Sequence, residues 1–265
     1  MRLWDRAMSC CRCLRWAVSL SSQEPVSEQE WRLAVQCIQP EEWKRIDRFH
    51  FREDEMTSLI GRLMLRQATR QGDWIILGTS CAPSIGVDVM NVTEFNKKMH
   101  RNADGYINFM QRQFSSAELQ KMRSQLDDRW KLCYFYRYWC LKESIIKATG
   151  VGIHDDLASL DFRVNTHQLV TDALASDTLL YDGDVPQTKW IFEESMLDQQ
   201  HCVAVCKEAV PPAHCTAGRT NSMVFHQMSL SQLLEQADLI NELPNDAANE
   251  WQLFSRKSDK PRRQT

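Results

Sequence analysis

The sequence predicts an α+β protein, in which helices and short strands are both present and follow no regular alternation. Two observations favour this class. Apolar residues recur at helical spacing behind recognisable start signals, and short runs rich in β-branched and aromatic residues lie between turn-forming residues. We expect helices at about 28–38, 41–51, 52–69, 102–112, 116–123, 128–149 and 228–240, and strands at about 14–19, 73–77, 85–90, 160–164, 179–182, 190–194 and 202–207.

Local capping chemistry supports the helix boundaries. Ser27 with Glu30, and Ser115 with Glu118, have the spacing of a capping box, in which each side chain binds the backbone of the other residue. Gly150 ends the longest predicted helix, because glycine readily adopts the left-handed conformation that closes helices. The helix that reaches Arg70 differs, since nothing breaks it before Gly72 and a strand follows at once.

Composition excludes several classes of protein. The chain has 265 residues, enough for one large or two small domains, with 43% apolar and 25% charged residues as in soluble proteins. Its net charge of −3 provides no general attraction for nucleic acid, and no apolar run approaches the roughly 18 residues that cross a membrane. The start of the chain lacks the apolar block of a secretion signal. We interpret the ten cysteines as reduced, mostly buried thiols, which favours the cytosol.

Three sets of residues are candidates for chemistry. Asp88 is expected at the end of a short apolar strand, where it either faces a ligand or simply forms a turn. Glu143 and Lys147 lie four residues apart on one face of an aromatic-rich helix, so they form either a solvated ion pair or a partly buried site for an ion or ligand. Arg45 is either a surface residue or a clamp for phosphate oxygens, which the guanidinium group suits.

Together, Asp88 and Glu143 provide two oxygen ligands of the kind that Mg²⁺ prefers, with waters and substrate phosphates completing its coordination. Lys147, one helical turn beyond Glu143, is placed to neutralise a phosphate oxygen. This combination is typical of the transfer of phosphate-bearing groups, where positioning and charge neutralisation provide most of the catalysis.

The motif Gly86-Val87-Asp88-Val89, followed by Trp139-x-x-Lys142-Glu143-Ser144-x-x-Lys147-Ala148-x-Gly150, resembles the Sfp-type 4′-phosphopantetheinyl transferases. The resemblance runs from about Leu14 to Lys207 and includes Gln39–Phe51, Gly61–Met64 and Phe192–Ser195. It implies a pseudo-dimer of two similar α/β halves with the site between them. It also implies an enzyme that moves the 4′-phosphopantetheine arm of coenzyme A onto a serine of an acyl- or peptidyl-carrier protein and releases adenosine 3′,5′-bisphosphate.

The same resemblance implies a role for each candidate residue. Asp88 and Glu143 would bind Mg²⁺, and Glu143 would help to deprotonate the attacking serine. Lys147 would act in catalysis by holding the coenzyme A phosphates, and Arg45 would contact the 3′-phosphate end of coenzyme A. Gln71 resembles a residue beside the metal. The implied partners are carrier domains of the fatty acid synthase and aminoadipate-semialdehyde dehydrogenase types. We expect the protein to be a monomer that binds neither nucleic acid nor a membrane.

The sequence departs from the family between Arg70 and Gln71, where the predicted helix runs directly into a strand. Members of the family have a Gly-Lys-Pro motif and an Asn-x-Ser-His strand, both of which contact coenzyme A, between positions that are adjacent here as Arg70 and Gln71. We therefore expect an incomplete N-terminal half at 1–90, a C-terminal half with the metal-binding helix at 91–208, and a flexible polar tail at 209–265. The alternatives to an active enzyme are an impaired variant that retains at most partner binding, and a helical adaptor without a ligand.

Overall fold

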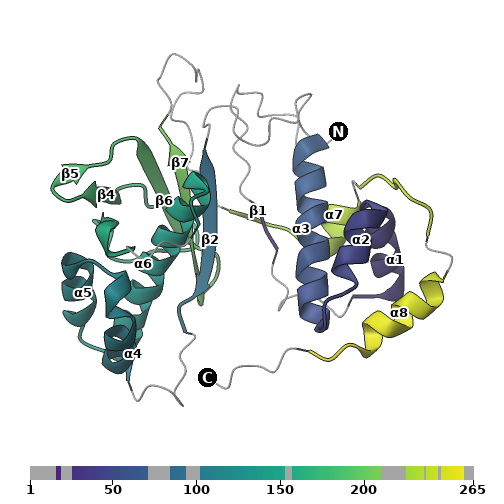
Figure 1. The fold of residues 1–265 in the computed structure, drawn as a ribbon, viewed down its shortest axis with the longest axis horizontal. Helices are drawn as coiled ribbons and strands as arrows, with labels where there is room; N and C mark the ends of the chain where they lie inside the picture. The colour runs from purple at the N-terminus through teal and green to yellow at the C-terminus, as the bar shows by residue number, and fades with distance from the viewer. Residues whose placement is uncertain are drawn as a thin grey trace. The chain divides into compact units, whose positions relative to one another are not determined.

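A computed structural model describes residues 16–18, 26–70, 84–93, 102–152, 157–209, 225–235, 237–243 and 246–259. The chain divides into two compact units, whose elements are labelled in Figure 1. The helical unit combines Leu14–Gly78 with Phe225–Arg262, and the central unit contains Thr79–Val224. Helices and antiparallel sheets occur together, which confirms the predicted mixed class.

The central unit is built around α6 (Asp128–Thr149), the long helix predicted from the sequence. Asp127 caps its first turn, and Gly150 ends it with a left-handed φ of 69°. A three-stranded antiparallel sheet packs on α6, in the order β2 (Ile85–Asn91), β7 (His201–Glu208) and β6 (Trp190–Met196). The buried aromatic and aliphatic side chains of α6 form the core with the inner face of this sheet.

Short elements enclose the other sides of α6. They are α4 (Ala103–Met110), a 3₁₀ turn at Gln111–Gln113, α5 (Ser116–Arg123) and a 3₁₀ turn at Leu157–Ser159. A second antiparallel sheet follows, with the strand order β3 (Asp161–Arg163), β4 (Leu179–Asp182) and β5 (Val185–Pro186). The predicted capping box of Ser115 and Glu118 is present at the start of α5.

The helical unit is formed by two segments that are far apart in the sequence. The first provides β1 (Trp16–Ala17), α1 (Glu28–Gln36), α2 (Pro40–Ile46) and α3 (Arg52–Arg70), and the second provides β8 (His226–Gln227), α7 (Leu230–Leu234) and α8 (Ala247–Arg256). β1 pairs with β8 in parallel, and α7 and α8 pack against α1. Fully buried Trp31 lies at the centre, with its ring centroid 5.3 Å from that of Trp43 and 5.9 Å from that of Phe254.

Polar contacts of the residues that follow α8 attach this end of the chain to the rest of the helical unit. Lys257, just after the helix, forms an ion pair of 2.5 Å with fully buried Glu55 on α3 and donates a hydrogen bond to the carbonyl oxygen of Asp47. Arg52 binds the carboxylate of Asp259 at 2.5 Å. Burial raises the pKa of Glu55 to about 7, although Lys257 opposes the shift.

The structure differs from the sequence interpretation in the last part of the chain. Residues 225–259 do not form a separate polar tail where they are described, but carry β8, α7 and α8 and complete the helical unit. The helix predicted at 228–240 is limited to Leu230–Leu234, and α8 was not predicted at all. α8 is stable here because Phe254 and Trp251 pack on Trp31. The strand predicted at 73–77 lies outside the described residues.

Two other expectations are tested in part. The described cysteines Cys37, Cys133, Cys140, Cys202 and Cys206 are free thiols, in agreement with the prediction of reduced cysteines for these five. Across the part of the chain that the structure describes, no helix has the length and apolar character needed to cross a membrane.

Candidate functional site

The site begins with the close approach of strand β2 to helix α6. Gly86 has no side chain, and a Cβ atom added there would lie 2.0 Å from the carbonyl oxygen of Ser144 and 2.5 Å from the backbone nitrogen of Ala148. Both of these atoms belong to the helix backbone, so any larger residue would push the strand away from the helix. Glycine at this position therefore brings Asp88, two residues further along the strand, beside the last turns of α6.

Asp88 is held there by Lys147. Its Oδ1 atom is 2.7 Å from the Nζ atom of Lys147, which also donates a hydrogen bond of 3.0 Å to the carbonyl oxygen of Val87. The Asp88 side chain is only 12% exposed, whereas that of Lys147 is 48% exposed. The Oδ2 atom of Asp88 is buried and has no hydrogen-bond partner among the described residues, which is costly for a carboxylate oxygen unless a ligand or ion satisfies it.

Glu143 completes a trio of charged groups. Burial raises the pKa of Glu143 above its usual range, the negative charge of Asp88 raises it further, and Lys147 opposes both effects. The two carboxylates therefore lie close enough to repel each other. Because Glu143 and Lys147 are four residues apart on α6, both lie on the face of the helix that packs on β2, the strand that carries Asp88.

This arrangement fits a small divalent cation. Two carboxylates that repel each other, one of them with an unsatisfied buried oxygen, are stabilised by a positive ion placed between them. Within the described ranges, no group of three or more His, Cys, Asp or Glu side chains is arranged so that it could hold a metal ion. The two carboxylates of Asp88 and Glu143 are compatible with Mg²⁺, which prefers few protein ligands supplemented by water and phosphate oxygens.

No described contact joins Arg45 or Gln71, the other two predicted site residues, to Asp88, Glu143 or Lys147. Arg45 is exposed in the last turn of α2 and belongs to the helical unit. Gln71 lies outside the described residues. The phosphate-binding role of Arg45 and the metal-side role of Gln71 stay predictions.

Two buried ion pairs on α6 were missed by the sequence interpretation. Lys142, next to Glu143, forms an ion pair of 2.9 Å with Glu118 of α5, and both side chains are almost completely buried. Arg137 binds both carboxylate oxygens of Glu194 on β6, at 2.7 and 2.9 Å. For Arg137 the available signal was its position between Tyr136 and Tyr138, since a charge among aromatic residues needs a buried partner, whereas Lys142 adjoins Glu143 and has no such local signal.

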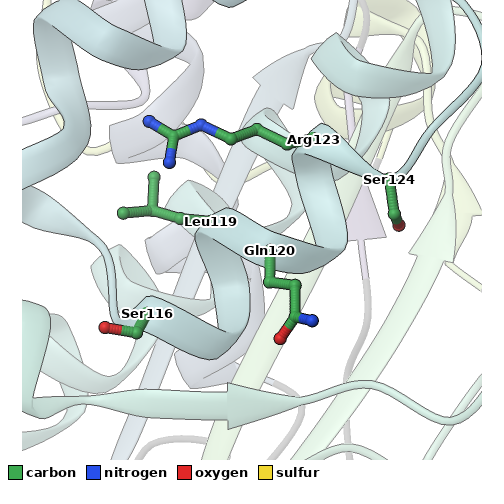
Figure 2. A pocket seen from close by; sticks show the side chains of 5 residues that line it. All are labelled: Ser116, Leu119, Gln120, Arg123 and Ser124. Atoms are coloured by element: carbon green, nitrogen blue, oxygen red, sulfur yellow. The ribbon is translucent and has the colours of Figure 1, made fainter.

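A pocket of about 510 Å³ lies elsewhere on the central unit (Figure 2). It is lined by one face of α5 and the residue that follows this helix, with the side chains of Ser116, Leu119, Gln120, Arg123 and Ser124. Neither Asp88 nor Glu143 nor Lys147 contributes to it. The pocket and the carboxylate site are therefore distinct.

In the structure Asp88 lies in the middle of β2, not at the strand end where the sequence interpretation placed it, and it neighbours a glutamate and a lysine that are one turn apart on α6. Comparison with known families identifies the class of protein. Residues 84–206 match the 4′-phosphopantetheinyl transferase superfamily, and residues 23–76 match the family described as 4′-phosphopantetheinyl transferase, N-terminal. The chain belongs to the 4′-phosphopantetheinyl transferases and is thus a transferase enzyme.

Individual relatives of this chain within the family have more specific names. L-aminoadipate-semialdehyde dehydrogenase-phosphopantetheinyl transferase from Rattus norvegicus is 33% identical over 232 residues, covering 72% of this chain and 74% of the relative. The protein of the same name from Xenopus laevis is 28% identical over 290 residues, covering 95% and 94%. The 4′-phosphopantetheinyl transferase of Bacillus subtilis is 24% identical over 225 residues, covering 72% and 90%.

Proposed function

We propose that this protein transfers the 4′-phosphopantetheine group of coenzyme A to a serine of acyl- or peptidyl-carrier domains, in a reaction that depends on Mg²⁺. The observation that carries the proposal is the buried, unpaired oxygen of Asp88 beside Glu143 and Lys147. Family membership identifies the transferred group, and the names of the animal relatives favour a carrier domain of the aminoadipate-semialdehyde dehydrogenase type.

Each residue of the trio has a specific task. Asp88 and Glu143 would hold Mg²⁺, which would neutralise negative charge on the diphosphate of coenzyme A. Lys147 is about half exposed, so its ammonium group can turn from Asp88 toward a phosphate oxygen. Gly86 keeps the strand and the helix together, so that the two carboxylates are neighbours before the substrate arrives.

The chemical step is a displacement at phosphorus. The serine Oγ atom forms a bond to the phosphorus that carries the pantetheine arm, and the bond from this phosphorus to the bridging oxygen breaks. Adenosine 3′,5′-bisphosphate leaves with that oxygen. The serine proton passes to the carboxylate of Glu143, which acts as the general base.

We further propose that the protein descends from a pseudo-dimer of two α/β halves and that its first half lacks a segment at the junction of Arg70 and Gln71. The alignment with the Xenopus relative extends over 290 residues although this chain has 265, so that relative has positions without a counterpart here. We assign these missing positions to the junction of Arg70 and Gln71, where a predicted helix runs into a predicted strand and no residue clearly ends the helix.

An impaired enzyme is the second candidate, and the same difference in length favours it. A shorter first half would hold the nucleotide of coenzyme A with fewer contacts, while Asp88, Glu143 and Lys147 are all in place. In that case we expect a large rise in the KM for coenzyme A and a smaller change in kcat, because the reacting groups are retained and uniform binding is lost.

The deciding experiment is the labelling of an apo carrier domain with a fluorescent coenzyme A analogue, with and without Mg²⁺. Mg²⁺-dependent labelling would support the enzyme. No labelling by a protein that is folded according to circular dichroism would refute the active enzyme, and labelling only at a high concentration of the analogue would indicate the impaired enzyme. Carrier domains of the fatty acid synthase type and of the aminoadipate-semialdehyde dehydrogenase type should be compared at equal concentration.

A further inference from the structure

The buried ion pair of Lys142 and Glu118 lies immediately beside the carboxylate site. The Nζ atom of Lys142 is 2.9 Å from Glu118 Oε2, and the side chains are 1% and 0% exposed. Nζ also donates hydrogen bonds to the carbonyl oxygens of Leu157, at 2.8 Å, and Leu160. Three acceptors thus surround an ammonium group that has three protons, so the lysine charge is fully satisfied.

Glu118 is equally well bound. Its Oε1 atom accepts a hydrogen bond of 3.0 Å from the backbone N–H of Phe162, and its Oε2 atom accepts one of 2.8 Å from the N–H of Ser115. The rings of Phe114 and Phe162 each lie 5.7 Å from the Lys142 ammonium group. One lysine of α6 is therefore tied to α5, to the 3₁₀ turn at Leu157–Ser159 and to β3.

These ties fix the rotation and the axial position of α6. A helix advances about 100° and 1.5 Å for each residue, so any rotation or sliding that moved Lys142 from its acceptors would move Glu143 by the same angle and distance. The neighbouring carboxylate is then directed toward β2, where Asp88 lies. Glu143 itself is partly exposed, and its carboxylate has no hydrogen bond to a described residue that would hold it in place.

Stability alone does not explain a buried ion pair at this position. Replacing such a pair with apolar residues of similar size is often neutral or even stabilising, because the charges lose their hydration on burial. An orienting role does explain it, since a charge with three acceptors in fixed directions tolerates one arrangement only. Groups that support metal ligands in this way usually affect metal affinity by about 10–100-fold.

We propose that Lys142 and Glu118 are positioning residues that set the orientation of Glu143 toward Asp88, and thereby the affinity of this site for a divalent cation. The inference rests on the metal-binding role proposed above for Glu143. Neither residue touches the substrate or the metal, because both side chains are buried against α5, β3 and the 3₁₀ turn at Leu157–Ser159.

The test replaces the pair in the full-length protein and measures Mn²⁺ binding from the electron paramagnetic resonance signal of free Mn²⁺, a readout independent of catalysis. The Lys142→Met/Glu118→Met variant keeps the volume and removes both charges. We expect it to unfold cooperatively and to bind Mn²⁺ about tenfold more weakly than the wild type. Glu118→Gln, which retains an acceptor for Phe162, should give a smaller loss in the same direction and serves if the double variant does not fold.

The second ion pair of α6 provides a matched control. Arg137→Met/Glu194→Met removes an equally buried pair further from Glu143 along the helix, and we expect its Mn²⁺ dissociation constant to stay within about twofold of the wild type. A dissociation constant unchanged in both folded Glu118 variants, with binding lost in Glu143→Ala, would overturn the positioning role alone. Absence of Mn²⁺ binding by the wild type would overturn the proposed metal site and this inference with it.

Discussion

The buried ion pair of Lys257 and Glu55 in the helical unit allows a quantitative prediction about stability. Lys257→Met removes the ammonium group that pairs with a fully buried carboxylate and leaves the aliphatic part of the side chain. Removing one partner of a buried ion pair usually costs about 3–5 kcal/mol, provided that the other partner stays charged. Glu55 need not stay charged, because its pKa in the folded protein is already about 7.

The cost should therefore depend on pH. Burial is the main cause of the raised pKa of Glu55, so the folded state holds the proton more tightly than the unfolded chain. In the wild type, the contribution of Glu55 to stability declines from about pH 4.5 to pH 7 and is constant above. Without Lys257, the pKa of Glu55 rises further and this decline continues above pH 7, by up to about 1.4 kcal/mol per pH unit.

Urea denaturation at pH 6 and pH 8, followed by tryptophan fluorescence, measures this difference. The Lys257→Met variant should lose clearly more stability relative to the wild type at pH 8 than at pH 6. The control is Glu55→Gln/Lys257→Met, in which neither position titrates in this range, so the free energy of unfolding of this variant should itself vary much less between pH 6 and pH 8 than that of Lys257→Met. A loss for Lys257→Met that is equal at both pH values, or greater at pH 6, would refute the reasoning.

Three further predictions concern other parts of the molecule. Gly86→Ala should destabilise the central unit by about 1–3 kcal/mol, because its Cβ atom would overlap the backbone of α6. Gly61→Ala is the control and should be neutral or slightly stabilising, because nothing lies within 4 Å of the added Cβ. Thermal unfolding of the two variants measures the difference. Glu143→Ala should abolish Mg²⁺-dependent transfer and leave the circular dichroism spectrum unchanged, and retained activity would contradict the role of this carboxylate. Deletion of residues 246–265 should cost the helical unit at least about 3 kcal/mol through loss of the buried Phe254 ring, seen as a red shift of tryptophan fluorescence, while deletion of 260–265 alone should have no such effect.

Much of the central unit and of the candidate site could be predicted from the sequence, because the signals are local. The capping residues and Gly150 define α5 and α6, and the spacing of Glu143 and Lys147 places both on one helix face. The ion pair between Asp88 and Lys147 could not be predicted, since it depends on the approach that Gly86 permits between distant segments.

The same limitation explains what was missed. The sequence interpretation of Glu118 as a capping residue is confirmed, but its ion pair with Lys142 joins residues whose proximity only the packing of α5 on α6 establishes. Helix α8 lies in a polar stretch with few apolar residues, and its stability comes from burying them against Trp31, more than two hundred positions earlier. Tertiary packing outweighs local composition in both cases.

The composition of the helical unit from two distant segments of the chain has a consequence for biosynthesis. The described residues of the central unit lie between positions 84 and 209, so this unit has all its described strands when that stretch has left the ribosome. Helices α1 to α3 are synthesised earlier, before β8, α7 and α8 are available to pack on them. Until then Trp31 lacks its contact with Phe254 of α8. Ribosomal stalling before residue 225 would leave the core of these helices without Phe254 and the buried leucines of α7, and the exposed apolar surface would favour binding by chaperones.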